Sequence, residues 1–406
     1  MASTSPEQLA RQLLEECLSG HDWSREALQL LLDSCADPRG TKALFAELVE
    51  PLGDRFDPRL VDCYVSIFSE AIARFIPGKT ARQIQDRYQR IRHPRAFVGE
   101  VGRVFVLSRI TLGADIAITS QFLAAAAGLY PAAEIFFVGP RKNFELFSGD
   151  PRLQLVDFNY GRSGLLADRL KSGQELAKAL SGNNSLVFDP DSRLTQLGLL
   201  PVISDDQYFF FESRSFGAKG SRSIAELSGD FIRDRLGYGG VLPWVNPSQP
   251  ASARSNDVAI SFGFGGNPAK RVGETFELET VRSLTGLGLD VLLDEGGSSE
   301  EHDLARRIAA ATGCRTHHGS FASFSRQIEA SRLYVGYDSA GQHAAAAFRV
   351  SSITAFRGWV DERMLARWSP SGKGQNRVIR VKNEPQAEVA MRVLEEAVDV
   401  LRLNNP

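Results

Sequence analysis

The chain has 406 residues, of which 43% are hydrophobic and 24% are charged. This length suffices for two or three domains, and the composition is that of an ordinary globular protein. The formal net charge of −2 argues against nucleic acid as a partner. No apolar run approaches the length of a membrane span, and residues 1–7 lack the features of a secretory signal. We therefore expect a cytoplasmic protein.

The four cysteines are widely spaced and form no CxxC pair: Cys17, Cys35, Cys63 and Cys314. Such spacing builds neither a disulfide framework nor a metal site. We therefore expect reduced thiols, no bound metal and no cofactor.

Residues 1–95 predict an all-helical N-terminal module, because apolar residues recur at helical spacing and strand signals are weak. Four or five helices are expected, with Ser24, Asp57 and Thr80 as N-caps. The break at His93-Pro94-Arg95 ends the module. Its role stays open between acceptor recognition, docking of a partner and a position near a membrane that holds a lipid-linked acceptor.

Residues 100–245 alternate strand and helix patterns, which favours a parallel sheet covered on both faces. A helix is expected over 115–128. The expected strands are 103–107, 134–138, 153–156, 185–188 and 207–211. This segment therefore predicts a first Rossmann-like domain.

Three prolines in residues 242–250 predict a linker, because proline disrupts both helices and central strands. The alternation then restarts over 256–380 and predicts a second Rossmann-like domain. Its expected strands are 258–262, 290–293, 333–336 and 351–356, and its expected helices are 274–284, 299–311, 321–330 and 341–348. A last amphipathic helix over 385–403 is expected to pack back on the first Rossmann-like domain.

Two loops that follow strands carry polar groups suited to a ligand. Residues 108–116 open a helix, and Asp115 is there either a functional acid or, more commonly, an N-cap. Residues 262–271 hold three glycines followed by Lys270 and Arg271. Backbone N–H groups and cations suit a diphosphate, although a mobile surface loop has the same composition.

A third loop, Asp338 to His343, joins an apolar strand to an alanine-rich helix. Loops of this kind lie at the carboxyl edge of a parallel sheet, where α/β proteins bind ligands. Asp338 can accept hydrogen bonds from sugar hydroxyls, and His343 can donate one to an anion. A histidine beside such a helix otherwise serves packing or capping. After the last strand, Trp368 can frame a base or belong to the core.

The three loops together resemble a known family. R-I-T-L-G-A-D-I at 109–116, G-G-N-P-A-K-R at 265–271 and V-G-Y-D-S-A-G-Q-H-A-A-A at 335–346 resemble the lipopolysaccharide heptosyltransferases of glycosyltransferase family 9. The resemblance covers about residues 100–380. It implies the GT-B fold, with an acceptor domain first and a nucleotide-sugar donor domain second.

The resemblance also implies roles for individual residues. Asp115 is then the catalytic general base, with Arg109 beside it on the acceptor side. The donor site is implied at Gly265, Gly266, Lys270, Asp338, Ser339 and His343, with Lys270 meeting the diphosphate.

The implied activity is that of an inverting, metal-independent glycosyltransferase. Such an enzyme would move a sugar to a hydroxyl of a glycan, lipid-linked or protein acceptor. The resemblance implies heptose as the sugar and ADP-heptose as its donor. Cell-envelope glycan or lipopolysaccharide biosynthesis and contact with the inner membrane face follow from the same resemblance. Two alternatives stay open: a catalytically idle sugar-nucleotide-binding or scaffold protein of this fold, and a sugar-nucleotide epimerase with the GT-B fold.

Overall fold

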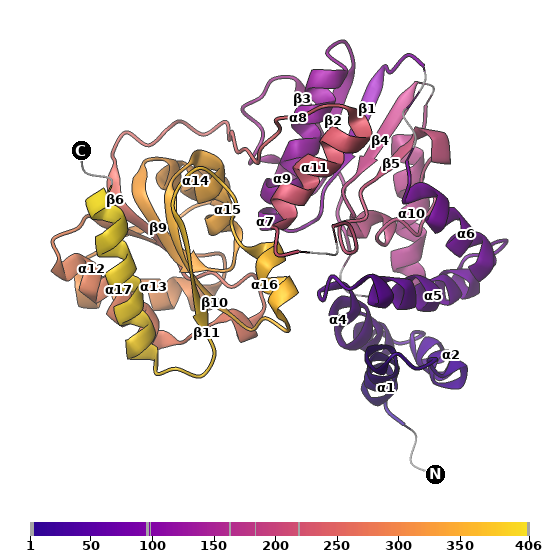
Figure 1. Ribbon diagram of the computed structural model, residues 1–406, viewed down its shortest axis with the longest axis horizontal. Coiled ribbons are helices and arrows are strands. Elements are labelled where there is room, and N and C mark those ends of the chain that lie inside the picture. Colours follow the sequence, from indigo (N-terminus) through magenta and orange to yellow (C-terminus); the bar gives the residue numbers. More distant parts are fainter. Residues whose placement is uncertain are drawn as a thin grey trace.

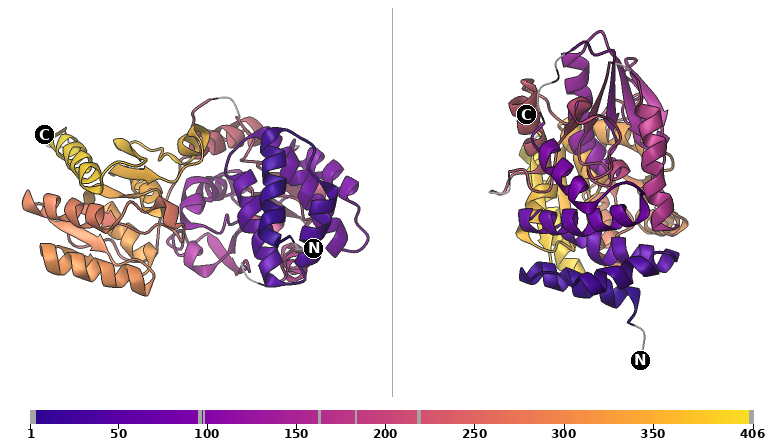
Figure 2. Two further views of the ribbon diagram at one scale, coloured as in Figure 1. Left: turned by 90° about the horizontal axis from the view of Figure 1, so that it is seen from below. Right: turned by 90° about the vertical axis from the view of Figure 1, so that its right-hand side faces the viewer.

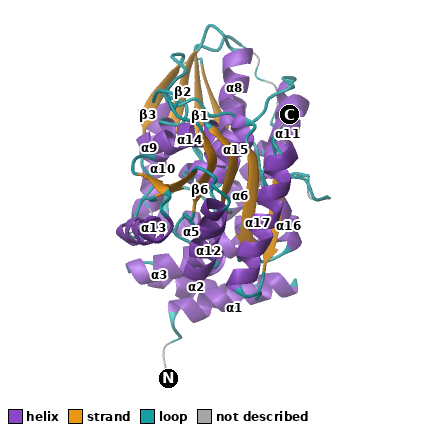
Figure 3. Ribbon diagram, turned by 90° about the vertical axis from the view of Figure 1, so that its left-hand side faces the viewer, coloured by secondary structure: helices purple, strands orange, loops and turns teal. Residues whose placement is uncertain are grey.

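The computed structural model contains two parallel β-sheets that lie in separate lobes (Figure 1). Helices flank the strands (Figure 3). The structure describes residues 4–94, 97, 99–161, 164–182, 184–217 and 220–403. The described residues 237–255 form neither helix nor strand and connect the two lobes. The predicted α/β class with two Rossmann-like domains is confirmed, while residue 95, the expected end of the helical module, lies outside the described residues.

The first sheet has the strand order β3-β2-β1-β4-β5, and all its pairs are parallel. Its strands are β1 (Arg103–Leu107), β2 (Glu134–Gly139), β3 (Leu153–Asp157), β4 (Ser185–Asp189) and β5 (Tyr208–Phe210). Residues Val104 to Leu107 of the central strand β1 are all buried, as expected when helices cover both faces of a sheet. The strand order reverses between β1 and β4, and ligands bind at the carboxyl ends of strands at such a switch point.

The second sheet has the strand order β11-β10-β9-β6-β7-β8, again with parallel pairs. Its strands are β6 (Asn256–Ser261), β7 (Val291–Asp294), β8 (Arg315–His317), β9 (Ser331–Tyr337), β10 (Ser351–Arg357) and β11 (Asn376–Val381). Numbered from β6, this is the full Rossmann order, and it reverses between β6 and β9. The second and third predicted loops follow these two strands, so the fold brings both loops to one switch point.

Two edge strands of the second sheet were not predicted. Strand β8 has only three residues, which is too short for a periodic pattern. Strand β11 carries Arg377 and Arg380 among its apolar residues and is only partly buried. Edge strands bury less of their surface than central ones, so their sequences carry a weaker apolar signal.

The N-terminal residues are helical, as predicted. The helices are α1 (Pro6–Ser19), α2 (Arg25–Ser34), α3 (Pro38–Ala43), α4 (Glu50–Gly53), α5 (Pro58–Phe75) and α6 (Ala81–Ile91), and a π-helical segment, η1 (Leu44–Val49), joins α3 to α4. Ser24, Asp57 and Thr80 each cap a helix by accepting a hydrogen bond from a backbone N–H of the first turn. All three N-cap predictions are confirmed.

The N-terminal helices share one hydrophobic core with the first sheet. Tyr64 of α5 and Phe105 of β1 belong to the same buried cluster. The hydroxyl of Tyr64 donates to the carbonyl of Gln196 at 2.8 Å, and Arg87 forms an ion pair of 2.8 Å with Asp205. Both views in Figure 2 place these helices against the first lobe. The helical module therefore covers the first Rossmann-like domain, and the hydrophobic cores of the two are continuous.

The other helices of the first lobe are α7 (Leu112–Ala114), α8 (Ser120–Leu129), α9 (Arg141–Phe144), α10 (Leu166–Leu180) and α11 (Ile224–Leu236), with a π-helical segment, η2 (Asp115–Thr119), between α7 and α8. The segment Leu112–Leu129 is long and apolar enough to cross a membrane, which corrects the expectation that no such run exists. It is 72% buried inside the protein. We interpret it as a core helix of the first lobe.

The second lobe contains α12 (Glu274–Gly286), α13 (Ser299–Thr312), α14 (Phe321–Glu329), α15 (Ala340–Phe348), α16 (Glu362–Trp368) and α17 (Gln386–Leu403). The prediction that the last helix packs on the first domain is wrong. Val389, Val393 and Ala397 of α17 lie in the core of the second sheet, and α17 contacts α12. The apolar face of α17 packs on the second sheet, whose last strand ends just before the helix begins. The chain therefore does not need to return to the first lobe to bury this face.

The short helix α16 makes the return contact instead. The guanidinium of Arg367 is fully buried and donates to the carbonyls of Arg222 at 2.8 Å and Gly217 at 2.7 Å. Arg363 donates to the carbonyl of Phe56 at 2.8 Å. Helix α16 therefore links the second lobe to both the first sheet domain and the helical module.

Candidate active site

The two switch points face each other across the junction of the lobes. Gly113, in α7 of the first lobe, lies against the start of α15 in the second. A Cβ atom at Gly113 would come within 3.1 Å of the His343 ring and 3.3 Å of the Ala340 Cα. Glycine therefore permits the close approach, and the first and third predicted loops are in contact.

Lys270 and Asp338, predicted from separate loops, form an ion pair of 2.7 Å between Nζ and Oδ2. The ammonium also donates to the Asp338 carbonyl at 3.0 Å, and Gln342 donates to Oδ1 at 2.7 Å. Asp338 is only 3% exposed. In this arrangement the carboxylate positions Lys270 and does not present a free acceptor to sugar hydroxyls.

The glycine loop beside this pair is open. Gly265 and Gly266 are exposed and have φ values of 63° and 79°, a region that L side chains rarely adopt. No atom lies within 4 Å of a Cβ built at either position, so space does not require glycine there; the backbone conformation does. Ser339 precedes α15 as its N-cap residue without a capping side-chain bond. These residues follow the two strands, β6 and β9, that flank the switch point of the second sheet.

His343 does not supply a cation. It is 5% exposed, and its ring lies 6.2 Å from that of Trp368 in an edge-on arrangement. Burial lowers the pKa of His343 to about 4, against the opposing effect of Asp338 and with the help of Lys270. The imidazole is therefore neutral near pH 7, and its contact with the Gly113 loop indicates a packing role at the lobe junction.

We expect the neutral His343 to make stability depend on pH. In the unfolded state the histidine pKa is about 6.5, so the unfolded chain takes up the proton before the folded protein does as the pH falls. The stability that the neutral His343 contributes is therefore fully present above about pH 6.5 and is lost as the pH falls through 4. The loss reaches about 3 kcal/mol at most. Burial raises the pKa of Asp189 to about 6, which acts in the opposite direction. Urea unfolding of wild type and His343→Gln at pH 7 and pH 5 isolates the histidine, and equal pH dependence in both proteins would contradict this prediction.

Asp115 lies beneath the first loop and is not accessible. Its side chain is fully buried and accepts hydrogen bonds from Ser108 Oγ, the Arg109 N–H, Thr119 Oγ1 and Asn143 Nδ2, at 2.5 to 2.6 Å. Burial raises its pKa, and the hydrogen bonds oppose that effect. The sequence suggested either a general base or an N-cap at Asp115, and neither describes this geometry. The carboxylate does not face the cleft, and it binds the preceding loop instead of capping α7. It anchors the loop.

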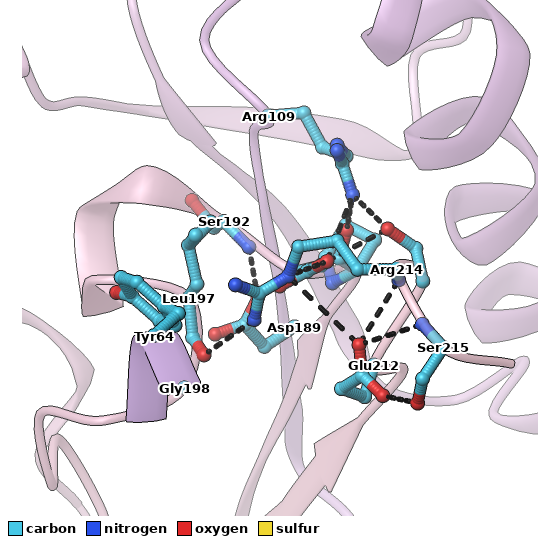
Figure 4. Close-up of polar contacts among 12 residues, drawn as sticks. Tyr64, Arg109, Asp189, Ser192, Leu197, Gly198, Glu212, Arg214 and Ser215 are labelled. Atoms are coloured by element: carbon cyan, nitrogen blue, oxygen red, sulfur yellow. Dashed lines mark hydrogen bonds and ion pairs between the residues drawn. The ribbon is translucent and has the colours of Figure 1, made fainter. Parts of the chain in front are cut away.

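Arg109 belongs to a buried charged cluster at the carboxyl ends of β4 and β5 (Figure 4). Its Nη1 donates to the Pro190 carbonyl at 2.8 Å and to Ser213 Oγ at 2.7 Å, and lies 3.6 Å from Asp191. Arg214 Nε binds the same Asp191 at 3.1 Å. Burial lowers the pKa of Arg109. The cluster supports the floor of the cavity described next.

A cavity of about 250 Å³ lies above this cluster. The helical module contributes Lys42, Phe45, Ala46, Val49, Glu50, Gly53, Asp54, Phe56 and Tyr64; the first sheet domain contributes Arg109, Tyr160, Arg169, Arg193, Gln196, Leu197 and Arg214; and the second lobe contributes Trp368. Most of these residues were not predicted, because the module carries no motif and lies outside the family resemblance. Trp368 packs edge-on against Phe56, with 6.0 Å between the ring centroids, and so joins the lobes. The sequence had suggested that Trp368 either frames a nucleotide base or belongs to the core.

Among the residues that the structure describes, no group of three or more histidine, cysteine, aspartate or glutamate side chains could hold a metal ion. The four cysteines are all free thiols.

No protein-family model and no curated protein sequence matches the chain. Solved structures do match its fold. The ADP-heptose LPS heptosyltransferase II of E. coli aligns with 20% identity and a TM-score of 0.53, over 75% of this chain and 100% of its own. A glycosyl transferase of family 9 from Veillonella parvula DSM 2008 aligns with 13% identity and a TM-score of 0.54, over 75% and 98%. The E. coli heptosyltransferase WaaC with ADP aligns with 15% identity and a TM-score of 0.55, over 73% and 99%.

These structures align over nearly their whole length, whereas about a quarter of this chain has no counterpart in them. The chain therefore has the two-domain fold of the family 9 heptosyltransferases, as the resemblance implied, together with an addition that they lack.

Proposed function

We propose that the chain is an inverting, metal-independent glycosyltransferase that moves a sugar from a nucleotide-sugar to a hydroxyl acceptor. One observation carries the proposal. Lys270 and Asp338 come from separate loops, meet at 2.7 Å at the switch point of the second sheet, and lie beside the loop of the first lobe that touches α15. Ligands of Rossmann-like domains bind at such points.

The donor diphosphate fits beside Lys270. The ammonium, the N–H groups of Gly265 and Gly266 and the N-terminus of α15 all stabilise negative charge. An acceptor hydroxyl attacks the anomeric carbon in line as the bond to the diphosphate breaks, which inverts the anomeric centre. The charge that grows on the leaving diphosphate is stabilised by these groups.

We further propose ADP-heptose as the donor, since two of the matched structures are named for ADP-heptose or contain ADP. A cytoplasmic role in cell-envelope glycan or lipopolysaccharide synthesis is consistent with that donor. The acceptor is then a glycan, a lipid-linked sugar or a protein, and a lipid-linked acceptor would bring the protein to the inner membrane face.

A second candidate is the catalytically idle sugar-nucleotide-binding protein. It is favoured by Asp115, whose carboxylate is fully engaged by four donors. Release of nucleoside diphosphate from a nucleotide-sugar only in the presence of an acceptor separates the two functions: the transferase shows it, and the binding protein does not.

Replacing Lys270 with Ala should weaken binding of ADP by about 1.5–3 kcal/mol, because a charged hydrogen bond to the diphosphate is lost. Asp338→Ala should weaken binding of the intact nucleotide-sugar by freeing Lys270 from its position. Calorimetry with ADP, UDP and GDP measures the first effect, and calorimetry with ADP-heptose measures the second. Lys373→Ala, which changes an exposed lysine of the same lobe, is the matched control. Unchanged affinity in the Lys270 and Asp338 variants would remove this pair from the donor site.

A further inference from the structure

The cavity between the helical module and the first lobe lies at the junction with the second lobe, which contributes Trp368 to its wall. Its other walls come from the helical module, mainly the π-helical segment η1 with α4, and from the first sheet domain, mainly the loop after β4. Segments of π-helix are frequently found at functional sites. The position, next to the switch point of the first sheet, is where a second substrate would meet the donor.

Three buried side chains of the cavity wall have hydrogen-bond donors without a partner among the described residues. They are Gln196 Nε2, Arg214 Nη1 and Arg169 Nε. The residues are 3%, 3% and 8% exposed. Unsatisfied buried donors are costly. Arg193 adds a cation that shares its charge with Glu50 at 3.4 Å. These donor atoms are themselves enclosed by protein, so the charge of the wall decides what it can bind. Five cations line the cavity, namely Lys42, Arg109, Arg169, Arg193 and Arg214, against two carboxylates, Glu50 and Asp54. This positive excess favours an oxyanion as the ligand.

Asp54, which follows α4, is the free acid of this cavity. Its side chain is exposed within the cavity, and no hydrogen bond or ion pair from a described residue engages its carboxylate. Lys270 of the donor loop and Arg109 of the first loop both lie within electrostatic range of it. Desolvation within the cavity raises the pKa of Asp54, and the nearby cations, Arg193 first, oppose that effect. A raised pKa suits a group that accepts a proton. Asp54 thus lines the cavity beside Arg109 and Arg193, and neither of its carboxylate oxygens is engaged by a described residue.

We propose that this cavity is the acceptor site, that its excess of cationic side chains holds an oxyanion of the acceptor, and that Asp54, supplied by the helical module, takes the proton of the attacking hydroxyl. The inference rests on the proposed glycosyl transfer. The acceptor O–H bond breaks as its oxygen bonds to the anomeric carbon, the proton goes to the Asp54 carboxylate, and the electron pair of the old C–O bond leaves with the diphosphate. The acceptor class is a hydroxyl compound that carries a phosphate or carboxylate.

The base is tested with ADP-heptose as donor and glycerol 3-phosphate as acceptor probe, by following release of ADP. Asp54→Asn should lower the rate by about 10²–10⁴-fold. It should leave ADP affinity unchanged and should not lower the melting temperature, because the carboxylate has no structural partner. Wild-type turnover should rise with pH through the ionisation of Asp54, and the variant should lose that rise. Glu47→Gln, a carboxylate of the same continuous helix that pairs with Arg11 outside the cavity, is the control and should keep wild-type rates.

The acceptor class is tested in the same assay by replacing glycerol 3-phosphate with glycerol. The phosphate compound should be at least tenfold faster in wild type, and Arg193→Gln, which removes a partly exposed cation of the cavity wall, should reduce that preference. Equal rates with both probes, or an Asp54→Asn rate within threefold of wild type, would overturn this inference while leaving glycosyl transfer in place. Absence of binding to ADP, UDP and GDP by the wild-type protein would instead refute the proposed function, and this inference with it.

Discussion

Replacing Asp115 with Ala should lower the free energy of unfolding by about 3–5 kcal/mol. The substitution leaves four donors without an acceptor in a site that water does not reach. Removing one partner from a buried charged network has a cost of this size. Urea unfolding measures it, with Asp168→Ala, an exposed acid of α10, as the control that should change stability by less than about 0.5 kcal/mol.

Asp115→Asn should be milder, at about 1–2 kcal/mol. The Oδ1 atom of Asn143 has no partner among the described residues, so a flip of that amide lets it accept from the new N–H. The variant also separates the two roles of Asp115. A loop anchor predicts a stability loss with turnover that follows the folded fraction. A general base predicts normal stability with turnover lowered by about 10²–10⁴-fold. That outcome would show that Asp115, and not Asp54, accepts the proton of the acceptor hydroxyl.

Replacing Arg367 with Lys should loosen the lobes and lower the free energy of unfolding by about 2–4 kcal/mol. The planar guanidinium donates to several carbonyls of the first lobe at once. A lysine ammonium cannot donate to all of them, because its N–H groups extend from a single nitrogen. Burial lowers the pKa of Arg367 to about 10, so the group remains a cation at neutral pH.

Small-angle scattering should show a larger radius of gyration for Arg367→Lys, because α16 is the link from the second lobe to both the first sheet domain and the helical module. Arg380→Ala, which removes an exposed arginine of β11 paired with Glu362, is the control and should leave the scattering curve unchanged. An unchanged curve for Arg367→Lys as well would show that the Gly113 and α15 contact holds the lobes without this clamp.

The sequence alone predicted the features that depend on local pattern. Apolar runs such as Val104 to Leu107 identified the central strands. Such strands are buried on both faces, so their consecutive residues are all apolar. Ser24 and Thr80 identified helix starts, because an N-cap bonds to its own first turn. The loops around Lys270 and Asp338 followed from the rule that parallel sheets bind ligands at their carboxyl edge.

The tertiary structure decided what depends on distant neighbours. Asp115 became a buried anchor because Asn143, 28 residues further along the chain, supplies its fourth donor. Helix α17 found its apolar partners on the second sheet, although its own pattern fits either lobe. Asp54 carries no motif, and only the packing of the helical module on the first sheet brings it to the cleft. Periodicity reports that a face is buried but not what covers it, so these pairings appear only when the chain is folded.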